Sequence, residues 1–528
     1  MKRESCQPGR RLLGRFVSLP LSGSPIAPAT AALRTPCKLF VVPSIIVLVT
    51  VIFVLHLQAQ TLSGPTYSEW RISPASITVV QGSYTGSITA LNTKDQTGTQ
   101  NIAADYVQFG TTGGQQFTGY FSFTVPSGVT ASQITSIQLM ANVLAPKDTA
   151  DSWDYSIYNW KNAAYEHLGN QNHCGGSTGL HTCSDDSSSF LDWRWNQYNA
   201  NGDATKSDYV NSTTGEIRIQ LASSNASSYE DIDWISVAVY TSKGTGAIFY
   251  PPTTYRWQYQ LTATAADGTS YPSTQGIDTT VCAVPYTGGA CVEPLIIDFD
   301  FYESSSISGS NNFLYATGAV NSLHSMSKKA IGYVDAGDVE QGRPDYQQYV
   351  DFDNACSGCL IGNPFSGFRS EYMLNINNDK GQADFIRKMV SARTDRVAAN
   401  GFDAVEYDVL CNYENKSGFT ITDATQASFN ISLAAIAHNH FLSVPLKSDV
   451  DQATESPIES AFDFVIDEQC NQYSQCGNYS SWQAASKAIF NVEYKLATSK
   501  FCPQDNSANI NGILKNYSLD VTPYTAYR

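Results

Sequence analysis

The sequence predicts a multidomain chain in which an all-β antiparallel sandwich precedes a (β/α)8 TIM barrel, with a hydrophobic signal or anchor segment near the amino terminus. Three observations lead to this prediction. The chain has 528 residues, more than one hydrophobic core normally holds. Short runs with a hydrophobic period of two occupy residues from about 65 to 245, and apolar strands alternate with helical stretches after about residue 247. We therefore expect a basic extension (1–38), a signal-anchor or signal peptide (39–59), a β-sandwich accessory domain (60–246) and a TIM-barrel domain (247–528).

The amino-terminal part has the pattern of a chain that enters the secretory route. Residues 39–57 (LFVVPSIIVLVTVIFVLHL) contain no Asp, Glu, Lys or Arg. Residues 1–38 hold seven Lys or Arg against a single acid, Glu4. This pattern predicts a single membrane anchor with a cytosolic amino end, or a signal peptide cleaved after Ala59, and the long basic flank favours the anchor. We expect the rest of the chain to be extracellular or at the cell surface.

The cysteines support this destination. Ten of the twelve Cys follow the apolar run, an even number with several close spacings, as disulfides require. His173, Cys174, His181 and Cys183 are the residue types of a zinc site. An oxidising compartment favours a disulfide between the two cysteines instead, and we expect no metal. By proximity we expect the bridges Cys174–Cys183, Cys282–Cys291, Cys470–Cys476 and Cys411–Cys502, and a bridge or staple within Cys356-Ser-Gly-Cys359.

Six Asn-x-Ser/Thr sequons add to the evidence for secretion. They lie at Asn211, Asn225, Asn415, Asn430, Asn478 and Asn516.

Residues 60–528 are strongly acidic. The whole chain holds 32 Lys and Arg and 48 Asp and Glu, and seven of these bases and one acid lie before residue 39, so this part has 25 against 47, a net charge of −22. Such a surface repels nucleic acid and anionic polysaccharide and attracts a cationic polymer. Solubility outside the cell accounts for the same charge equally well.

Residues 60–246 contain the alternating runs of an antiparallel sandwich. The strands that we expect are GSITAL (86–91), GYFSFTV (119–125), SIQLMANVL (136–144), GEIRIQL (215–221) and DWISVAVY (233–240). Four tryptophans here either form a stacking platform for sugar rings, which would make this a carbohydrate-binding domain, or belong to the core. We expect core for at least half of Trp153, Trp160, Trp193 and Trp195.

After residue 247 eight candidate strands alternate with helical segments, which is the size and order of a (β/α)8 barrel. A doubly wound sheet is the alternative. Two helices are expected at 384–401 and 422–440. The strands are PLIIDFDFY (294–302), KAIGYVDAG (329–337), EYMLNIN (371–377), FDAVEYDVL (402–410), FLSVPLKSD (441–449), FDFVIDEQC (462–470), KAIFNVEY (487–494) and INGILKNYSL (510–519).

Charged residues gather at the carboxyl ends of these strands, where barrel enzymes place their catalytic groups. In FDAVEYDVL the period of two predicts that Phe402, Ala404, Glu406 and Asp408 face the lumen and that Val405 and Tyr407 face outward. Tyr494 is also expected to face outward and to pack. The other strand ends carry Asp300, Asp335, Lys447, Glu468 and Glu493.

Two carboxylates across a sugar-sized cleft are what glycoside hydrolysis requires, because one protonates the leaving oxygen while the other attacks the sugar or activates water. We assign these roles to Asp408 and Glu468. An internal ion pair is the alternative for Glu406, and Lys447 is expected to keep one carboxylate ionised. The chemistry requires no cofactor. The residues that we expect to bind substrate are Asp300, Tyr333, Asp335, Glu406, Lys447 and Glu493.

The chain resembles the endo-α-1,4-polygalactosaminidase family, glycoside hydrolase family 114, over about residues 250–528. The resemblance implies a (β/α)8 fold and endo-cleavage of α-1,4-linked galactosamine polymers, which are cationic, with the family's two carboxylates at Asp408 and Glu468. The family has Asp where this chain has Asn375 and Asn where it has Asp467, so the exact sugar stays open. The matching stretches are YRWQYQLTATAADG (255–268), IGYVDAGDVEQGRPDY (331–346), GFDAVEYDVL (401–410), DFVIDEQCNQYSQC (463–476) and KAIFNVEY (487–494).

Two other functions agree with the same residues. One is a cell-surface carbohydrate-binding protein whose barrel no longer turns substrate over. The other is a glycosidase that acts on a different α-linked glycan.

Overall fold

The computed structural model describes most of the chain after residue 65. The described residues are 66–96, 102–144, 153–170, 193–200, 205–226, 229–243, 247–261, 276–285, 287–300, 317–341, 343–368, 370–520 and 525–526.

Two antiparallel sheets form the amino-terminal part. The first consists of β1 (Thr66–Ile72), β3 (Ser83–Thr85), β4 (Val107–Gly110), β6 (Ile134–Leu144), β9 (Arg194–Asn199) and β11 (Tyr229–Lys243), in the order β3-β4-β11-β6-β9 with β1 also paired to β11. The second consists of β2 (Ser76–Gln81), β5 (Thr118–Thr124), β7 (Trp153–Asn159), β8 (Ala164–Asn170) and β10 (Glu216–Ser223), in the order β2-β5-β10-β7-β8. Short 3₁₀ helices are η1 (Ile88–Asn92), η2 (Ala131–Gln133) and η3 (Lys206–Tyr209).

The inward faces of the two sheets share one apolar core. Phe121 of β5 and Ile219 of β10 lie in the same buried cluster as Leu139 of β6 and Val237 of β11. Along β10, buried residues alternate with half-buried ones. This period of two is what the sequence shows, and the predicted antiparallel β-region is confirmed.

Two details of this part differ from or refine the prediction. The strand expected at 86–91 is wrong, because Gly86 has a φ of 106° and Ser87 caps η1 by accepting a hydrogen bond from the Thr89 N–H. Of the tryptophans, Trp153 and Trp193 are buried and Trp160 is half-buried. The Trp195 side chain lies outside the described part.

Eight parallel strands follow among the described residues of the carboxyl-terminal part. In the first run β12 pairs with β13, β13 with β14, and β14 with β18, and in the second β19 pairs with β20, β20 with β21, and β21 with β22. Their bounds are β12 (Trp257–Tyr259), β13 (Ile296–Asp300), β14 (Lys329–Asp335), β18 (Ala404–Asp408), β19 (Pro445–Lys447), β20 (Phe464–Glu468), β21 (Ile489–Glu493) and β22 (Asn511–Leu514), and β22 also pairs antiparallel with β23 (Thr525–Ala526).

The two runs approach each other at both ends. A parallel bridge joins Ala404 to Ser443, between β18 and the start of β19. At the other end, the indole Nε1 of Trp257 donates to the carbonyl oxygen of Asn511 at 2.8 Å. Both runs contribute to one apolar cluster, which includes Ile331 and Phe490. A doubly wound sheet reverses its strand order, whereas these described strands follow chain order throughout.

One of the eight predicted strands is wrong and one was missed. β17 (Glu371–Leu374), predicted as a parallel strand, instead pairs antiparallel with β15 (Asp338–Glu340) and β16 (Ile361–Pro364) in a separate small sheet. The missed strand is β12. The missed strand β12 adds one parallel strand before β18, and the wrongly assigned β17 removes one. β18 is therefore still the fourth parallel strand, as predicted.

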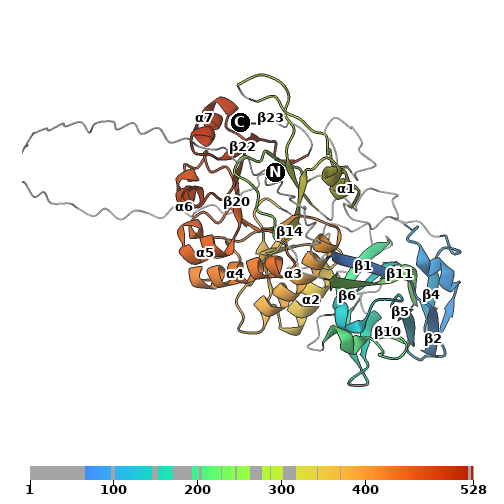
Figure 1. The fold of residues 1–528 in the computed structure, drawn as a ribbon. Helices are drawn as coiled ribbons and strands as arrows, with labels where there is room; N and C mark the ends of the chain where they lie inside the picture. The colour runs from blue at the N-terminus through green and yellow to red at the C-terminus, as the bar shows by residue number, and fades with distance from the viewer. Residues whose placement is uncertain are drawn as a thin grey trace, which may run out of the picture. The chain divides into compact units, whose positions relative to one another are not determined.

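Helices connect the parallel strands and lie outside them, as the arc from α2 to α7 around β14, β20 and β22 shows in Figure 1. The two helices expected from the sequence are confirmed as α3 and α4. The helices are α1 (Thr317–Ser325), α2 (Tyr346–Ala355), α3 (Gln382–Ala399), α4 (Asp423–Asn439), α5 (Ser456–Ala461), α6 (Ser480–Ala484) and α7 (Thr498–Ser507), with the short 3₁₀ helices η6 (Gln452–Thr454) and η7 (Cys476–Tyr479).

The alternation predicted for β18 is largely confirmed. The Tyr407 hydroxyl lies 2.8 Å from Thr394 Oγ1 of α3, so this side chain faces the helices. Glu406 and Asp408 point to the opposite side, where they meet β19. Phe402 precedes the strand and packs at 5.0 Å against the ring of Phe299, among residues that face the helices, so its predicted lumen position is wrong.

Three disulfides are present among the described residues: Cys282–Cys291, Cys356–Cys359 and Cys470–Cys476. The predicted Cys411–Cys502 bridge is wrong, because Cys502 is a buried free thiol while Cys411 is disulfide-bonded elsewhere. Proximity along the sequence identified the short bridges and failed for the pair assigned by elimination.

Several predictions fall on residues that the structure does not describe, including the segments 1–38 and 39–59 and the pair Cys174–Cys183. None of the helices in the described ranges has the length and apolar character that a membrane span requires. The sequon at Asn430 is fully buried in α4, where Asn430 Nδ2 donates to Leu410 O at 2.9 Å, so the folded chain does not offer it to a glycan.

Candidate functional site

The ammonium group of Lys447 lies at the centre of a buried cluster of acids. Its Nζ is 2.9 Å from Asp408 Oδ1, 2.8 Å from Glu406 Oε1 and 3.1 Å from Glu468 Oε1, and the Lys447 side chain is 0% exposed. It also donates to the hydroxyl oxygen of Tyr259 at 3.1 Å. We call these five residues the Lys447 cluster. β18, β19 and β20 each contribute their last residue to it, so three adjacent strand ends converge there.

Burial alone would lower the pKa of Lys447, but the negative charges of Asp408 and Glu406 outweigh this effect and raise that pKa well above its ordinary value. Lys447 is therefore a permanent cation at any physiological pH.

Asp408 is ionised and accessible from solvent. Burial opposes ionisation, but the Lys447 charge and a hydrogen bond from the Tyr333 hydroxyl at 2.8 Å lower the pKa of Asp408 below its ordinary value. The Val409 N–H adds a further bond to Oδ1 at 2.8 Å. The side chain of Asp408 is 12% exposed, whereas that of Glu406 is 0% exposed, so a ligand reaches the first and not the second.

Glu406 is the fully buried acid of the cluster. It accepts a hydrogen bond from the Tyr259 hydroxyl at 3.1 Å. Burial and the neighbouring charge of Glu406 raise the pKa of Asp298 well above its ordinary value. Both effects favour the neutral form of the Asp298 carboxyl group. The internal ion pair with Lys447 that was the alternative for Glu406 is present.

Glu468 contacts the lysine from the end of β20. Its Oε2 accepts a hydrogen bond from the Tyr494 hydroxyl at 2.7 Å, and its backbone N–H donates to Ser448 Oγ at 3.3 Å. Tyr494 was expected to pack outward. It instead reaches the site while its ring stacks on Tyr517 at 4.6 Å, so that prediction is wrong.

The residue after each strand-end member of the cluster has a left-handed backbone. The φ values are 59° for Val409, 50° for Ser448 and 70° for Gln469. A β-branched or long side chain is unfavourable in this region, and such strain concentrates at functional sites. Each turn ends its strand abruptly, which leaves the preceding side chain in the cluster.

The strand ends approach very closely beside Asp408. The Gly337 N–H donates to the Asp408 carbonyl oxygen at 3.1 Å, and a Cβ on Gly337 would lie 1.7 Å from the carbonyl oxygen of Val409. A side chain at position 337 would therefore displace the turn that carries Asp408.

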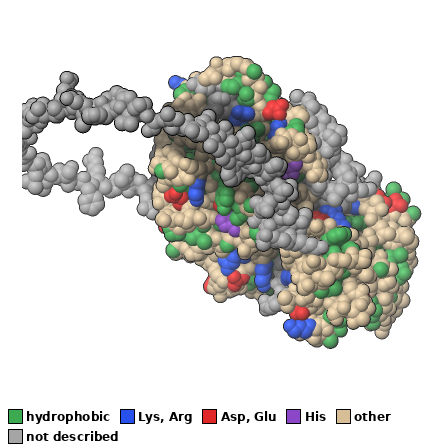
Figure 2. All heavy atoms as spheres, in the orientation of Figure 1, with side chains coloured by type: hydrophobic (Ala, Val, Ile, Leu, Met, Phe, Trp, Pro, Cys, Tyr) green, Lys and Arg blue, Asp and Glu red, His purple; other side chains and the backbone are tan. Residues whose placement is uncertain are grey.

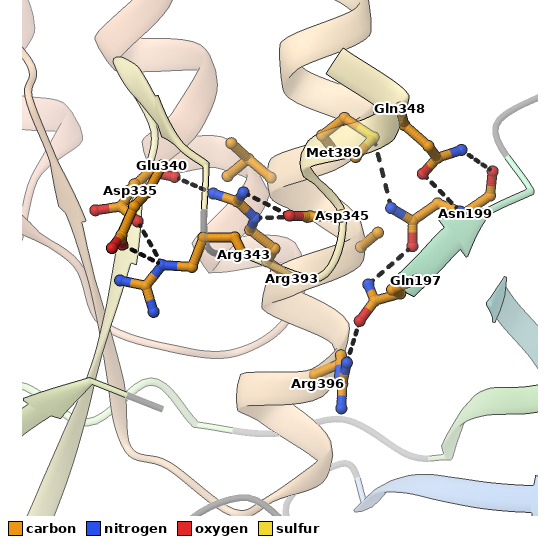
Figure 3. Close-up of polar contacts among 12 residues, drawn as sticks. Gln197, Asn199, Asp335, Glu340, Arg343, Asp345, Gln348, Met389, Arg393 and Arg396 are labelled. Carbon is orange, nitrogen blue, oxygen red and sulfur yellow. Dashed lines mark hydrogen bonds and ion pairs between the residues drawn. The ribbon is translucent and has the colours of Figure 1, made fainter. Parts of the chain in front are cut away.

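Asp300 and Asp335 do not join the Lys447 cluster directly. They bind Arg343, whose Nη2 lies 2.6 Å from Asp300 Oδ2 and whose Nε lies 3.1 Å from Asp335 Oδ2. Glu340 adds a third contact to the same guanidinium at 2.8 Å, as Figure 3 shows for Asp335 and Glu340. Asp335 is the register partner of Asp408 on the neighbouring strand, so this second group of charges borders the first.

Glu493 ends β21 but is not brought to the cluster. Its Oε1 accepts the backbone N–H of Asn471 at 2.9 Å, in the loop after β20. Burial raises the pKa of Glu493 to about 7 against these hydrogen bonds. Its observed contact is with the backbone that follows Glu468.

The described acids and histidines form no group suited to a metal ion. On the face drawn in Figure 2, the charged side chains of the described residues are dispersed in small groups.

Sequence reasoning missed two residues of this region, Tyr259 and Arg343, and misplaced a third, Tyr494. Tyr259 lies on a strand of only three residues, Arg343 lies in a loop, and Tyr494 follows the last residue of its strand. All three fall inside or at the edge of stretches quoted above for the family resemblance, which was the available signal.

Comparison with protein families matches two parts of the chain. The model of glycoside-hydrolase family GH114 matches residues 239–527. The model of the N-terminal glycosyl-hydrolase-114-associated domain matches residues 91–234. The first match alone spans more than half of the 528 residues. None of the curated proteins matches the chain.

Solved structures of carbohydrate-active proteins resemble the chain at low TM-scores. Aspergillus fumigatus Ega3 in complex with galactosamine has a TM-score of 0.41 and 24% identity, over 52% of this chain and 96% of that chain. The Podospora anserina GH26-CBM35 β-(1,4)-mannanase has 0.29 and 10%, over 86% and 93%. The Thermus thermophilus α-galactosidase TtGalA with stachyose has 0.31 and 10%, over 57% and 70%.

Proposed function

The chain belongs to glycoside-hydrolase family GH114 and is a glycoside hydrolase, and from this premise we propose that it cleaves α-1,4-linked galactosamine-containing polysaccharide internally. Asp408 and Glu468 are the catalytic carboxylates in this proposal. The observation that supports it most is their shared contact with Lys447, since two acids sixty positions apart in sequence reach one nitrogen atom.

The environments of the two carboxylates suggest their roles. Lys447 and Tyr333 stabilise the charged form of Asp408, which suits a group that must attack or stabilise a positive sugar carbon. Glu468 is then the proton donor to the leaving oxygen, and Tyr494 orients its Oε2.

The eight parallel strands close into a (β/α)8 barrel in this proposal, with the Lys447 cluster at the carboxyl-terminal end of the lumen. The contact of Trp257 with Asn511 and the apolar cluster common to both runs of strands support the closure.

A cationic sugar suits the charge of the site. Lys447 neutralises one of the three carboxylates that it touches, and Arg343 neutralises one of the three in the neighbouring group. Both groups keep a net negative charge when their acids are ionised, which attracts the ammonium group of a galactosamine unit. A different α-linked glycan is the alternative, and the substrates below distinguish the two.

The chain acts outside the cytosol in this proposal, secreted or held by an uncleaved anchor at the cell surface. The three disulfides among the described residues support an oxidising compartment.

Asp408→Asn and Glu468→Gln should each lower kcat by about 10²- to 10⁴-fold, because each removes an acid or base from the reaction. The measurement is the release of reducing ends from deacetylated polygalactosamine, with chitosan and the N-acetylated polymer in parallel. Asp467→Asn is the matched control, since Asp467 lies beside Glu468 but accepts a hydrogen bond from Tyr479 away from the cluster. Rates within about tenfold of wild type for both site variants would refute the assignment.

The reaction should retain the anomeric configuration. Asp408 Oδ1 and Glu468 Oε1 lie 2.9 and 3.1 Å from the same nitrogen, so they are at most about 6 Å apart. Carboxyl groups about 5 to 5.5 Å apart are typical of retaining enzymes, whereas inverting enzymes need about 6.5 to 9.5 Å for a water molecule. Proton NMR of the first products should show the α-anomer before mutarotation. Early accumulation of the β-anomer would exclude Asp408 as nucleophile.

A second function, carbohydrate binding by the amino-terminal part, is favoured by an aromatic group on the outer face of its second sheet. The Arg218 guanidinium lies 4.5 Å from the ring centre of Tyr120, 5.4 Å from that of Tyr158 and 4.9 Å from that of Trp160. Glu216 pairs with Arg218 at 3.0 Å, so the group is close to neutral. Rings beside hydrogen-bonding groups suit the mixed faces of sugars.

Trp160→Ala should weaken retention by the N-acetylated polymer in affinity gel electrophoresis about tenfold, the cost of losing one stacking ring. Tyr250→Ala removes a ring that is 61% exposed outside this group and serves as the control. If both variants migrate like the wild type in the polymer gel, the aromatic group has only a structural role.

A further inference from the structure

We propose that strands β8 and β9 of the amino-terminal part are positioning elements of the catalytic site, which fix Arg343 and, through it, Asp300 and Asp335. The inference rests on the proposed function and assigns to the GH114-associated region a role in holding the charged groups of the site.

The contact begins at the backbone of β9. The Gln197 N–H donates to the carbonyl oxygen of Pro344 at 2.6 Å, directly after Arg343 in the chain. The Asn199 N–H donates to Gln348 Oε1 at 2.7 Å, and Gln348 Nε2 returns a bond to Asn199 O at 3.1 Å. Gln348 lies in the first turn of α2, so β9 holds both the segment before this helix and the helix start.

β8 also forms hydrogen bonds with α2. Gln348 Nε2 also donates to Leu168 O at 2.9 Å, and the Asn170 N–H donates to Asp351 Oδ2 at 3.1 Å. A Cβ on Gly169 would lie 3.3 Å from Asp351 Oδ2, so the strand approaches the helix closely.

These contacts are buried, which makes them costly to break. Gln197 is 0% exposed, Asn199 2% and Gln348 6%. A buried polar group that loses its partner costs about 1 to 3 kcal/mol, so the polar groups of β9 and α2 constrain each other.

A second set of bonds carries the constraint from the helices to the strand ends. Asp345, the residue before α2, forms a two-point contact with Arg393 at 2.8 and 2.9 Å, and both side chains are fully buried. Arg393 Nη1 donates to the carbonyl oxygen of Asp335 at 2.7 Å. Figure 3 shows the Arg393 guanidinium between Asp345 and Asp335.

α3, which carries Arg393, is also held by the amino-terminal part. Arg396 donates to Gln197 Oε1, and Gln138 Nε2 of β6 donates to the Ala392 carbonyl oxygen at 2.8 Å. The Asn199 amide reaches Met389 Sδ at 3.5 Å. Pro344 and Asp345 follow Arg343 in the chain, and β9 contacts this segment directly through Pro344. β9 reaches Asp335 only indirectly, through α3, whose Arg393 binds the Asp335 carbonyl oxygen.

The test is a double-mutant cycle on the full chain between Gln348→Leu and Arg343→Ala, read as kcat/KM on deacetylated polygalactosamine. Gln348→Leu removes the side-chain contacts to β8 and β9, so we expect KM to rise at least about fivefold while kcat stays within about twofold. In the Arg343→Ala background the same change should have no further effect, because the residue through which β9 acts is gone.

Asn354→Leu is the matched control, since Asn354 lies on the exposed side of the same helix and should leave both constants unchanged. Gln348→Glu keeps the acceptor for the Asn199 N–H but loses the donor to Leu168 O and Asn199 O, so it should also raise KM, and it replaces the leucine variant if that chain does not fold. If Gln348 has only a structural role, the losses in kcat/KM of the two single variants should multiply in the double variant. That result, or an unchanged KM in Gln348→Leu, overturns the inference.

A wild type that releases no reducing ends would refute the proposed function. The same cycle, read as the dissociation constant for the polymer, then tests this inference separately.

Discussion

A buried ammonium group, that of Lys447, is the constraint on which the site depends. Leaving this charge without partners would cost several kcal/mol, so the fold must bring acids to it. Asp408, Glu406 and Glu468 meet that requirement from strands on either side. The same contacts fix the relative positions of two carboxylates from distant parts of the chain.

The backbone is strained where it leaves the site. Val409 and Gln469 have positive φ values directly after the two carboxylates, and Gly337 leaves no room for a side chain beside Val409. Such conformations persist only when the surrounding packing requires them. The apolar cluster beneath the strands and the helices around them supply that packing. The amino-terminal part adds polar contacts to α2 and α3, so support for the site extends beyond the parallel strands.

Much of this could be predicted from the sequence, because alternation and position determine where side chains point. The period of two placed Glu406 and Asp408 on one side of β18, and the charge at the end of β19 identified Lys447. The same argument failed for Glu493, whose contacts are with a following loop, since strand position says nothing about which neighbour a side chain reaches.

Other features had no readable local signal. EYMLNIN has the length and apolar content of a parallel strand, yet it pairs in a small antiparallel sheet, because partner choice is a tertiary property. β12 has only three residues, which are too few to show a hydrophobic period of two. The contacts of Arg343 and the pairing of Cys411 involve segments far apart in the chain. The local sequence therefore shows neither of them.

The most direct test of the account is the pKa of the Asp408 carboxyl group, measured by carbon NMR in the wild type and in Lys447→Met. The wild-type pKa should lie below the ordinary value for aspartate, about 3.9, and it should rise clearly when the ammonium group is removed. An Asp408 pKa that is ordinary in the wild type, or equal in the two proteins, would show that Lys447 does not control the charge at the site.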